Sequence, residues 1–252
     1  MAAASSAGSE GAKRPFLLHL EAYLARRDGV DKLLKIMRYT SKLLISSQHL
    51  VANTNPAVVA RLREFEASVG TSRKAFRLGK FVQDLNALRG SSSNFSSKEG
   101  ILELIAYGGE GIYYFVEQFI WLAKAGLIDK RYSKKLQKLS AWAEFIGYFG
   151  SVSLKALEIL ALLDQETKII DGFRKKSEGG EKELPADLAK QLHKLQAKRF
   201  MKALSLIQDF ADSLLSLSDI LDERGVLANP SLLAFSGLVS ALISAHKNWL
   251  SS

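Results

Sequence analysis

Proline is rare in this chain, and its scarcity limits what the chain can fold into. Only four prolines occur in 252 residues, at positions 15, 56, 185 and 230. The middle of the chain is dense in Leu, Ala, Lys and Glu, and no segment alternates apolar and polar residues as a half-buried strand does. The sequence therefore predicts an all-α protein rather than a β-sandwich or a doubly wound sheet.

The sequence offers no residues for catalysis or metal binding. It contains no cysteine, which excludes disulfides, thiolate metal sites and a cysteine nucleophile. The four histidines lack metal-ligand spacing, and no nucleophile has a base beside it. We therefore expect no enzymatic activity, no metal and no cofactor. Residues 1–14 also lack the apolar stretch of a signal peptide, so we do not expect secretion.

Positive charge is concentrated in the first third of the chain. The formal net charge is +9, and residues 1–90 carry 15 Lys and Arg against 7 Asp and Glu, a net of +8. Such asymmetry indicates a polyanionic partner for this third, either nucleic acid or an anionic lipid surface.

Composition divides the chain into six segments. Residues 1–13 are rich in Ala, Ser and Gly and are expected to be disordered. We expect a basic amphipathic helical region at 14–90, an apolar membrane-associated helical region at 98–170, a charged linker at 171–185, an amphipathic helix at 186–223 and a transmembrane helix at 226–246.

Helices with a basic flank beside an apolar face are expected within residues 14–90. A first helix begins after Pro15 and should stop near Gly29. The next, over residues 28–50, places Lys32, Lys35, Arg38 and Lys42 opposite its apolar side. After a turn expected at Gly70, a helix over residues 73–88 places Arg73, Arg77 and Lys80 beside Leu78, Phe81, Val82 and Leu85. This pattern is typical of a helix that lies in a membrane interface.

The sequence predicts a membrane span near the C-terminus and a second membrane-associated segment within residues 101–128 or 142–163. Residues 226–245 carry no charge, and twenty residues is the length that a helix needs to cross the hydrocarbon. A buried core helix is the alternative interpretation of this stretch. Residues 101–128 are aromatic and apolar but carry Glu103, Glu110, Glu117 and Lys124 on one line. Because carboxylates are costly against lipid, this segment is either a helix that lies against partners, with a solvated or partner-facing line of charges, or a membrane segment whose line of charges faces protein. The GGEG run at 108–111 is expected to be a helix break or a close-packing point.

Several blocks of the sequence resemble the peroxin-11 family of peroxisomal membrane proteins. They are YLARRDGVDKLLKIMRYTSKLL (23–44), SRKAFRLGKFV (72–82), AGLIDKRYSKKL (125–136) and SAWAEFIGY (140–148). The resemblance covers roughly residues 16–250 and is closest to plant members. It implies a role in peroxisome elongation and proliferation before fission.

The resemblance also implies a location and partners. It implies an integral protein of the peroxisomal membrane with both termini in the cytosol, self-association, and recruitment of the organelle fission machinery. It assigns binding of anionic lipid headgroups to the N-terminal amphipathic region. The residues concerned would be Arg73, Lys74, Arg77, Lys80, Leu78, Phe81, Val82 and Leu85, with Lys32, Lys35, Arg38 and Lys42 less firmly included.

Two other functions remain open at the level of sequence. A soluble helical module could bind nucleic acid through residues 28–89, although no recognisable DNA or RNA motif is present and nucleic acid is not the expected partner. A channel for small metabolites could use the line of glutamates in a membrane setting.

Overall fold

Every regular element in the described part of the chain is helical, which confirms the all-α prediction. The computed structural model describes residues 15–47, 55–91, 96–176, 185–222, 224, 227 and 229–252. The expected disorder of residues 1–13 lies outside these ranges. The elements are α1 (Phe16–Leu24), α2 (Arg27–Ser46), α4 (Pro56–Phe76), α5 (Phe81–Gly90), α6 (Lys98–Lys124), the 3₁₀ turn η1 (Lys130–Tyr132), α7 (Ser133–Lys176), α8 (Ala186–Ile220) and α9 (Pro230–Leu250).

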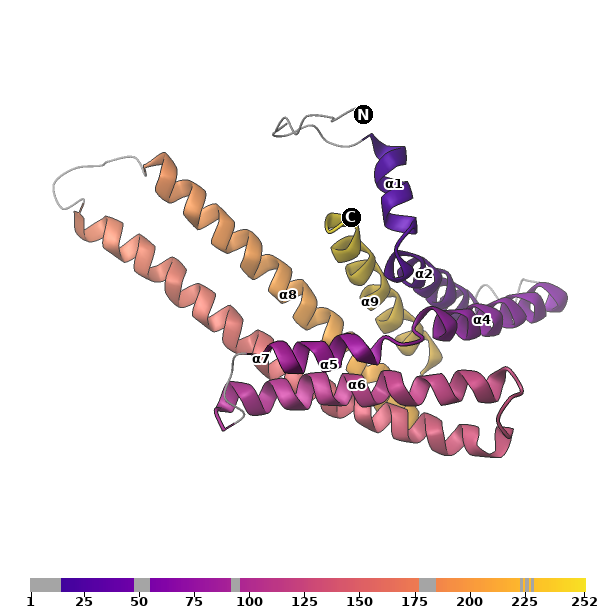
Figure 1. Ribbon diagram of the computed structural model, residues 1–252. Helices are drawn as coiled ribbons and strands as arrows, with labels where there is room; N and C mark the ends of the chain where they lie inside the picture. Colours follow the sequence, from indigo (N-terminus) through magenta and orange to yellow (C-terminus); the bar gives the residue numbers. More distant parts are fainter. Residues whose placement is uncertain are drawn as a thin grey trace, which may run out of the picture.

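The helices form two layers, which meet where α9 contacts α8 and α4 contacts α6 (Figure 1). In one layer α7 packs along α6 on one side and along α8 on the other, and α5 lies on α6. In the other layer α2 packs between α4 and α9, and α9 also contacts α8. The N-terminal helices and α9 therefore close over the long helices, leaving polar side chains of both layers opposite one another.

Local sequence explains where the helices begin. Asn55 caps α4 by accepting a hydrogen bond from the Ala57 amide at 2.9 Å, and Ser97 caps α6 by accepting one from Gly100 at 3.0 Å. Asn229 caps α9 in the same way, with Pro230 at the first helical position, where its missing N–H costs nothing.

Two glycines do not have the roles that the sequence predicted. Helix α2 begins at Arg27 and includes Gly29, which is needed because a Cβ there would lie 2.0 Å from the Tyr23 carbonyl oxygen. Likewise α4 continues through Gly70, whose Cβ position faces the Arg38 side chain at 3.2 Å. The turn falls instead between α4 and α5, where Gly79 has a φ of +75°. No single helix covers residues 73–88, because α4 ends at Phe76.

The glycines of α6 and α7 bring these two helices into close contact. A Cβ on Gly109 would lie 2.6 Å from the Cα of Gly147, and one on Gly150 would lie 2.6 Å from the Ala106 amide nitrogen. The GGEG run is therefore a close-packing point and not a break, since α6 is continuous through it. Small residues that let two helix backbones approach closely are typical of helices that pack inside membranes.

In the described part of the chain, one helix is long and apolar enough to cross a membrane, namely α7 with η1, Lys130–Arg174. Only 17% of its apolar window is buried inside the fold, whereas the core helix of a soluble protein is mostly buried. Among the described residues the C-terminal helix α9 does not meet the same test, although the sequence placed the span at 226–246. Its Ser-rich and Ala-rich face is buried against α2 and α8. Helix α7 also continues to Lys176, into the segment expected to be a linker.

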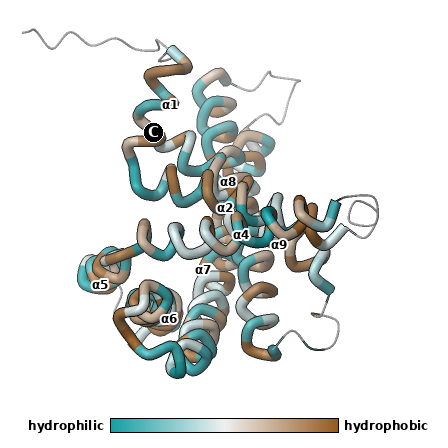
Figure 2. Tube along the Cα trace, turned by 90° about the vertical axis from the view of Figure 1, so that its right-hand side faces the viewer, coloured by the Kyte–Doolittle hydropathy of each residue, from teal (hydrophilic) through white to brown (hydrophobic). Residues whose placement is uncertain are grey.

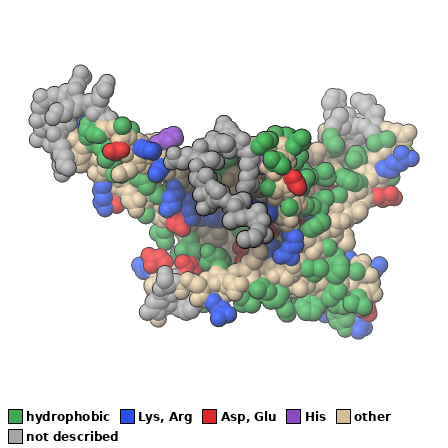
Figure 3. Space-filling view, turned by 45° about the horizontal axis from the view of Figure 1, so that its top comes forward, with side chains coloured by type: hydrophobic (Ala, Val, Ile, Leu, Met, Phe, Trp, Pro, Cys, Tyr) green, Lys and Arg blue, Asp and Glu red, His purple; other side chains and the backbone are tan. Residues whose placement is uncertain are grey.

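Many large apolar side chains lie on the outside of this fold, while several charged side chains are buried inside it. The hydropathy colouring alternates along each helix, and apolar side chains are spread over the visible surface (Figures 2 and 3). Helix α7 presents Leu139, Trp142, Ile146 and Phe149 outward, and α8 presents Phe200, Ile207, Phe210 and Leu214. Buried polar groups include Asp31, Lys35, Arg73, Glu117, Asp209 and Asp212. Charged residues are almost never fully buried in water-soluble proteins unless they are paired, so these buried charges need partners.

Candidate functional site

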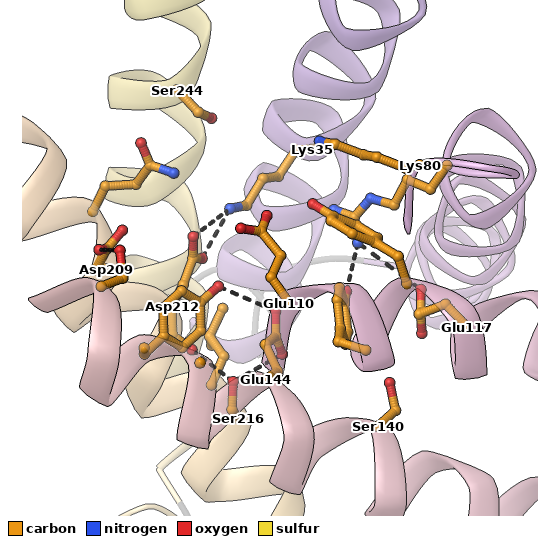
Figure 4. A pocket seen from close by; sticks show the side chains of 18 of the residues that line it. Lys35, Lys80, Glu110, Glu117, Ser140, Glu144, Asp209, Asp212, Ser216 and Ser244 are labelled. Atoms are coloured by element: carbon orange, nitrogen blue, oxygen red, sulfur yellow. Dashed lines mark hydrogen bonds and ion pairs between the residues drawn. The ribbon is translucent and has the colours of Figure 1, made fainter. Parts of the chain in front are cut away.

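The charged side chains meet in a cavity of about 720 Å³ between the two layers. Helices α2, α4, α6, α7, α8 and α9 all contribute to its wall. Lys35 of α2 and Lys80 of the turn before α5 lie across the cavity from four carboxylates that come from α6, α7 and α8 (Figure 4). These carboxylates are Glu110, Glu117, Glu144 and Asp212. We call this space the interior cavity.

Asp31 is the centre of one charged cluster. Its carboxylate lies 3.0 Å from Arg73 Nε, 3.4 Å from Arg77 Nε and 3.3 Å from Lys32 Nζ. Burial by itself would raise the pKa of Asp31, but the three cations outweigh it and hold that pKa well below its usual range. One carboxylate from α2 thus orders the end of α4.

Glu117 of α6 joins α4 to the lower layer. It pairs with Lys74 and lies 3.9 Å from Arg77 Nη1. The same Arg77 nitrogen donates a hydrogen bond of 2.6 Å to the Tyr113 hydroxyl. Glu110 and Lys124, from the same line on α6, also face the cavity. Of this line on α6, Glu117 is buried against α4, whereas Glu110 and Lys124 line the cavity and remain exposed.

Lys35 ties three helices together. Its Nζ donates to both carboxylate oxygens of Asp212 in α8, at 2.8 and 3.1 Å, and to the Ser240 hydroxyl of α9 at 2.6 Å. Ser240 in turn donates to Asp212 at 2.6 Å. Burial lowers the pKa of Lys35, an effect that Asp212 opposes. The small residue Ser240 is thus part of a polar network and does not face lipid.

A second charged cluster lies between α7, α8 and α9. Asp209 accepts hydrogen bonds from Lys155 and from Ser151, the latter at 2.7 Å. Lys247 donates to Gln208 at 3.2 Å. Glu144 accepts a hydrogen bond of 2.8 Å from Ser216. These contacts hold the C-terminal half of the chain around the cavity.

The predicted lipid-binding residues are divided between the cavity and the outer surface. The basic residues turn inward: Arg73 is 4% exposed, Lys35 is buried, Arg38 pairs with Glu66 at 2.7 Å, and Lys42 lies 4.0 Å from the same carboxylate. Lys80 lies 3.4 Å from Asp28, and Lys32 and Lys74 take part in the pairs described above.

The apolar members of the prediction lie toward the outside. Val82 and Leu85 are 45% and 50% exposed. Leu78 and Phe81 are half-buried, and the Phe81 ring packs edge-on against Phe115 with centroids 5.4 Å apart. The structure therefore separates the two halves of the predicted lipid-binding face.

Sequence reasoning missed the acidic partners because it looked for them on the same helix. Asp31, Glu117 and Asp212 each pair with a cation from another helix. The partners are Arg73, Lys74 and Lys35, and each pair is separated by 42 or more residues in sequence. The regular line of glutamates was the one signal that pointed to such partners. Among the described residues, no group of three or more His, Asp or Glu side chains is arranged to hold a metal ion.

A family model decides the relationship of this chain to known proteins. The model described as peroxisomal biogenesis factor 11 matches residues 17–249. The chain belongs to the peroxisomal biogenesis factor 11 family. The family is described by a role in organelle biogenesis and not by a catalysed reaction.

Individual relatives from plants agree with this membership. The chain is 52% identical over 239 residues to peroxisomal membrane protein 11A of Arabidopsis thaliana, with 94% of each chain covered. It is 49% identical to peroxisomal membrane protein 11-3 of Oryza sativa subsp. japonica, covering 94% of this chain and 90% of that protein. It is 26% identical to peroxisomal membrane protein 11A of Homo sapiens. These members of the biogenesis factor 11 family support a peroxisomal membrane location. No solved structure matches the chain.

Proposed function

We propose that this protein promotes peroxisome proliferation by binding and curving the peroxisomal membrane, which elongates the organelle before fission. The observation that carries the proposal is the exposed apolar surface of the N-terminal helices. It consists of Leu33, Met37 and Leu44 on α2, Val58 and Phe65 on α4, and Val82 and Leu85 on α5. Apolar side chains at the headgroup boundary bind a membrane in proportion to the area that they bury.

The division of charges refines how these helices would act. The cations beside the apolar faces are held by carboxylates of the same chain, so shallow apolar insertion contributes more than headgroup attraction at Arg73, Arg77 and Lys35. Arg61 and Arg63 of α4 are exposed and remain available to anionic headgroups. Helix α7 anchors the chain, and insertion of the N-terminal helices expands the cytosolic leaflet relative to the other.

The proposal includes self-association and recruitment of the fission machinery, which the family resemblance implies. It does not include nucleic acid as a partner. Most cations of the first third face the interior cavity, and the outer faces of α2, α4 and α5 carry apolar residues instead. A nucleic-acid surface would need those cations on the outside.

A double substitution on α5 tests the curvature mechanism. Val82→Glu with Leu85→Glu places two carboxylates on the exposed apolar face, which should abolish tubulation of anionic vesicles by the purified full-length protein. We expect peroxisomal targeting in cells to be retained, because neither side chain is buried.

A matched control is available on the same helix. Gln83→Glu with Asn86→Glu introduces the same charge at exposed polar positions and should leave tubulation unchanged. Tubulation at the wild-type level by the Val82/Leu85 variant would refute the mechanism.

The interior cavity supports a second candidate function, a pathway for small metabolites. Its wall is charged while the helices around it present apolar side chains outward, an arrangement found around polar pathways in membranes. We expect planar bilayers containing the protein to conduct, and conductance to fall when Glu110 and Glu117 are both replaced by Gln. If planar bilayers that contain the wild-type protein show no conductance, this candidate function is excluded.

A further inference from the structure

The wall of the interior cavity carries more positive than negative charge. Twelve Lys and Arg residues line it, against eight Asp and Glu residues. Asp31 and Glu66 do not line the cavity, but they pair with arginines that do. Counting these two carboxylates as well leaves twelve positive against ten negative charges, an excess of two. A concave surface with an excess of one sign of charge concentrates ions of the opposite sign. In Figure 3, Lys and Arg side chains are visible around a hollow in the face shown.

Cations outnumber carboxylates in the corner where α2 meets the turn between α4 and α5. There Lys32, Arg73 and Arg77 share the carboxylate of Asp31. Glu117 lies 3.9 Å from Arg77 but also pairs with Lys74. Arg73 Nη2 has no hydrogen-bond partner although the side chain is almost completely buried. A buried donor left without an acceptor is unfavourable by about 1 to 3 kcal/mol. The corner therefore holds more donors than the chain supplies acceptors for.

Lys80 adds a further cation at the entrance to this corner. Its Nζ lies 4.8 Å from the centre of the Tyr114 ring and 3.4 Å from Asp28, whose side chain is exposed to solvent. Burial lowers the pKa of Lys32 to about 7, and the neighbouring Lys80, Arg77 and Lys35 contribute to the same shift against Asp31. An anion bound here would relieve this crowding of like charges.

We propose that Lys32, Arg73, Arg77 and Lys80 form a binding site for a phosphate group, carried either by a small phosphorylated molecule or by a lipid headgroup. A phosphate monoester carries a charge close to −2 and three acceptor oxygens, which matches both the excess charge and the unpaired donor. The planar guanidinium groups of Arg73 and Arg77 suit phosphate oxygens better than a point charge would. The cavity is within the size range of small-molecule sites, about 300 to 1,000 Å³.

Thermal unfolding of the purified full-length protein in a zwitterionic detergent tests this site. Inorganic phosphate or glycerol 3-phosphate, titrated at pH 7 and constant ionic strength, should raise the unfolding temperature and reach saturation. Sodium chloride at the same ionic strength should have no such effect. A phosphate titration that cannot be distinguished from chloride overturns the proposal.

Two variants and a matched control locate the site. Lys32→Gln and Lys80→Gln should each weaken the apparent phosphate affinity about tenfold. Lys130→Gln removes the same charge from an exposed lysine outside the cavity wall and should leave the affinity unchanged. Lys80 is near the surface, so its variant provides the test even if Lys32→Gln does not fold. Equal weakening by Lys130→Gln would mean a diffuse charge effect and would contradict the site.

A short-chain phosphatidic acid distinguishes the two sources of the phosphate. If phosphatidic acid gives a saturable rise in the unfolding temperature at least ten times the rise given by glycerol 3-phosphate, the ligand is a lipid headgroup. If the two compounds raise the unfolding temperature to a comparable extent, the ligand is a free phosphorylated molecule.

The site rests on neither the curvature mechanism nor conduction. Tubulation by Lys80→Gln should remain at the wild-type level if curvature arises from the exposed apolar faces.

Discussion

Single buried carboxylates connect distant parts of this chain. Asp31 holds Arg73 and Arg77, and Asp212 holds Lys35 together with Ser240. Breaking such a pair by removing one partner leaves an uncompensated buried charge, which typically destabilises a fold by about 3 to 5 kcal/mol. These residues therefore have a structural role whatever the cavity binds.

Asp84 is a buried carboxyl with a different environment, and it makes a prediction about pH. Burial, reinforced by nearby Glu110, raises the pKa of Asp84 to about 7, and its Oδ2 has no hydrogen-bond partner. The raised pKa means that the protonated form stabilises the fold. That contribution is complete below about pH 4 and is lost as the pH rises through about 7.

Asp84→Asn removes this dependence on pH. Because one pKa unit corresponds to about 1.4 kcal/mol, we expect the variant to be more stable than wild type at pH 8 by on the order of 1 to 3 kcal/mol, and close to wild type at pH 4. Thermal unfolding in detergent at the two pH values measures the difference. A variant that is less stable at pH 8 would show that the carboxylate is needed.

At the scale of helices, the contact between α6 and α7 depends on glycines. Gly109→Ala would place a methyl group 2.6 Å from the Gly147 backbone, so the two helices would have to separate. We expect a loss of about 1 to 3 kcal/mol, the usual cost of overpacking a tight contact.

Gly108 provides the control for that substitution. It precedes Gly109 in the same helix, and a Cβ there meets nothing within 4 Å. Gly108→Ala should be neutral or stabilising by up to about 1 kcal/mol, since alanine favours a helix. Equal unfolding temperatures for both variants in detergent would contradict the assignment of the close contact to Gly109.

The sequence predicted helices and their apolar faces well but predicted the surroundings of those faces poorly. Val82 and Leu85 share an exposed face because their spacing follows helical periodicity, which is a local property. The inward position of Arg73 depends on Asp31, and that of Lys74 on Glu117, both contributed by other helices. Helical periodicity does not contain this information.

The location of the membrane span also could not be predicted from charge alone. Residues 226–245 lack charge but are rich in small polar residues, which suit packing against α2 and α8. Helix α7 contains Glu144 and Lys155, yet both face the interior cavity, so its outer side remains apolar. Which side of a helix its charges face decides whether lipid can surround it.

At the scale of the whole molecule, the first described helix, α1, lies against the end of α9. The Trp249 ring packs against Phe16, His19 and Tyr23, with centroids 5.9, 4.1 and 5.5 Å apart, and its carbonyl oxygen lies 2.8 Å from His19 Nε2. Because α1 contacts the end of α9, both termini are expected on the same side of the membrane, so the chain must cross it an even number of times and α7 cannot be its only crossing. The proposed function places that side in the cytosol.

Protease protection checks this sidedness. Tags placed at each end should both be digested when protease is added to intact peroxisomes, while a protein of the organelle interior stays protected. One tag digested and the other protected would contradict the contact between α1 and the end of α9.

Helix α7 has 44 residues and is therefore about 66 Å long. The hydrocarbon layer is about 30 Å thick, and even a helix tilted by about 40° would extend about 50 Å along the membrane normal. On the proposal that α7 crosses the membrane, some 20 Å or more of it, with α8 packed alongside, would stand outside the hydrocarbon. In many copies on one organelle, the protruding ends of α7 and α8 would collide laterally. The resulting lateral pressure would favour a narrow tubule even without further insertion into the leaflet.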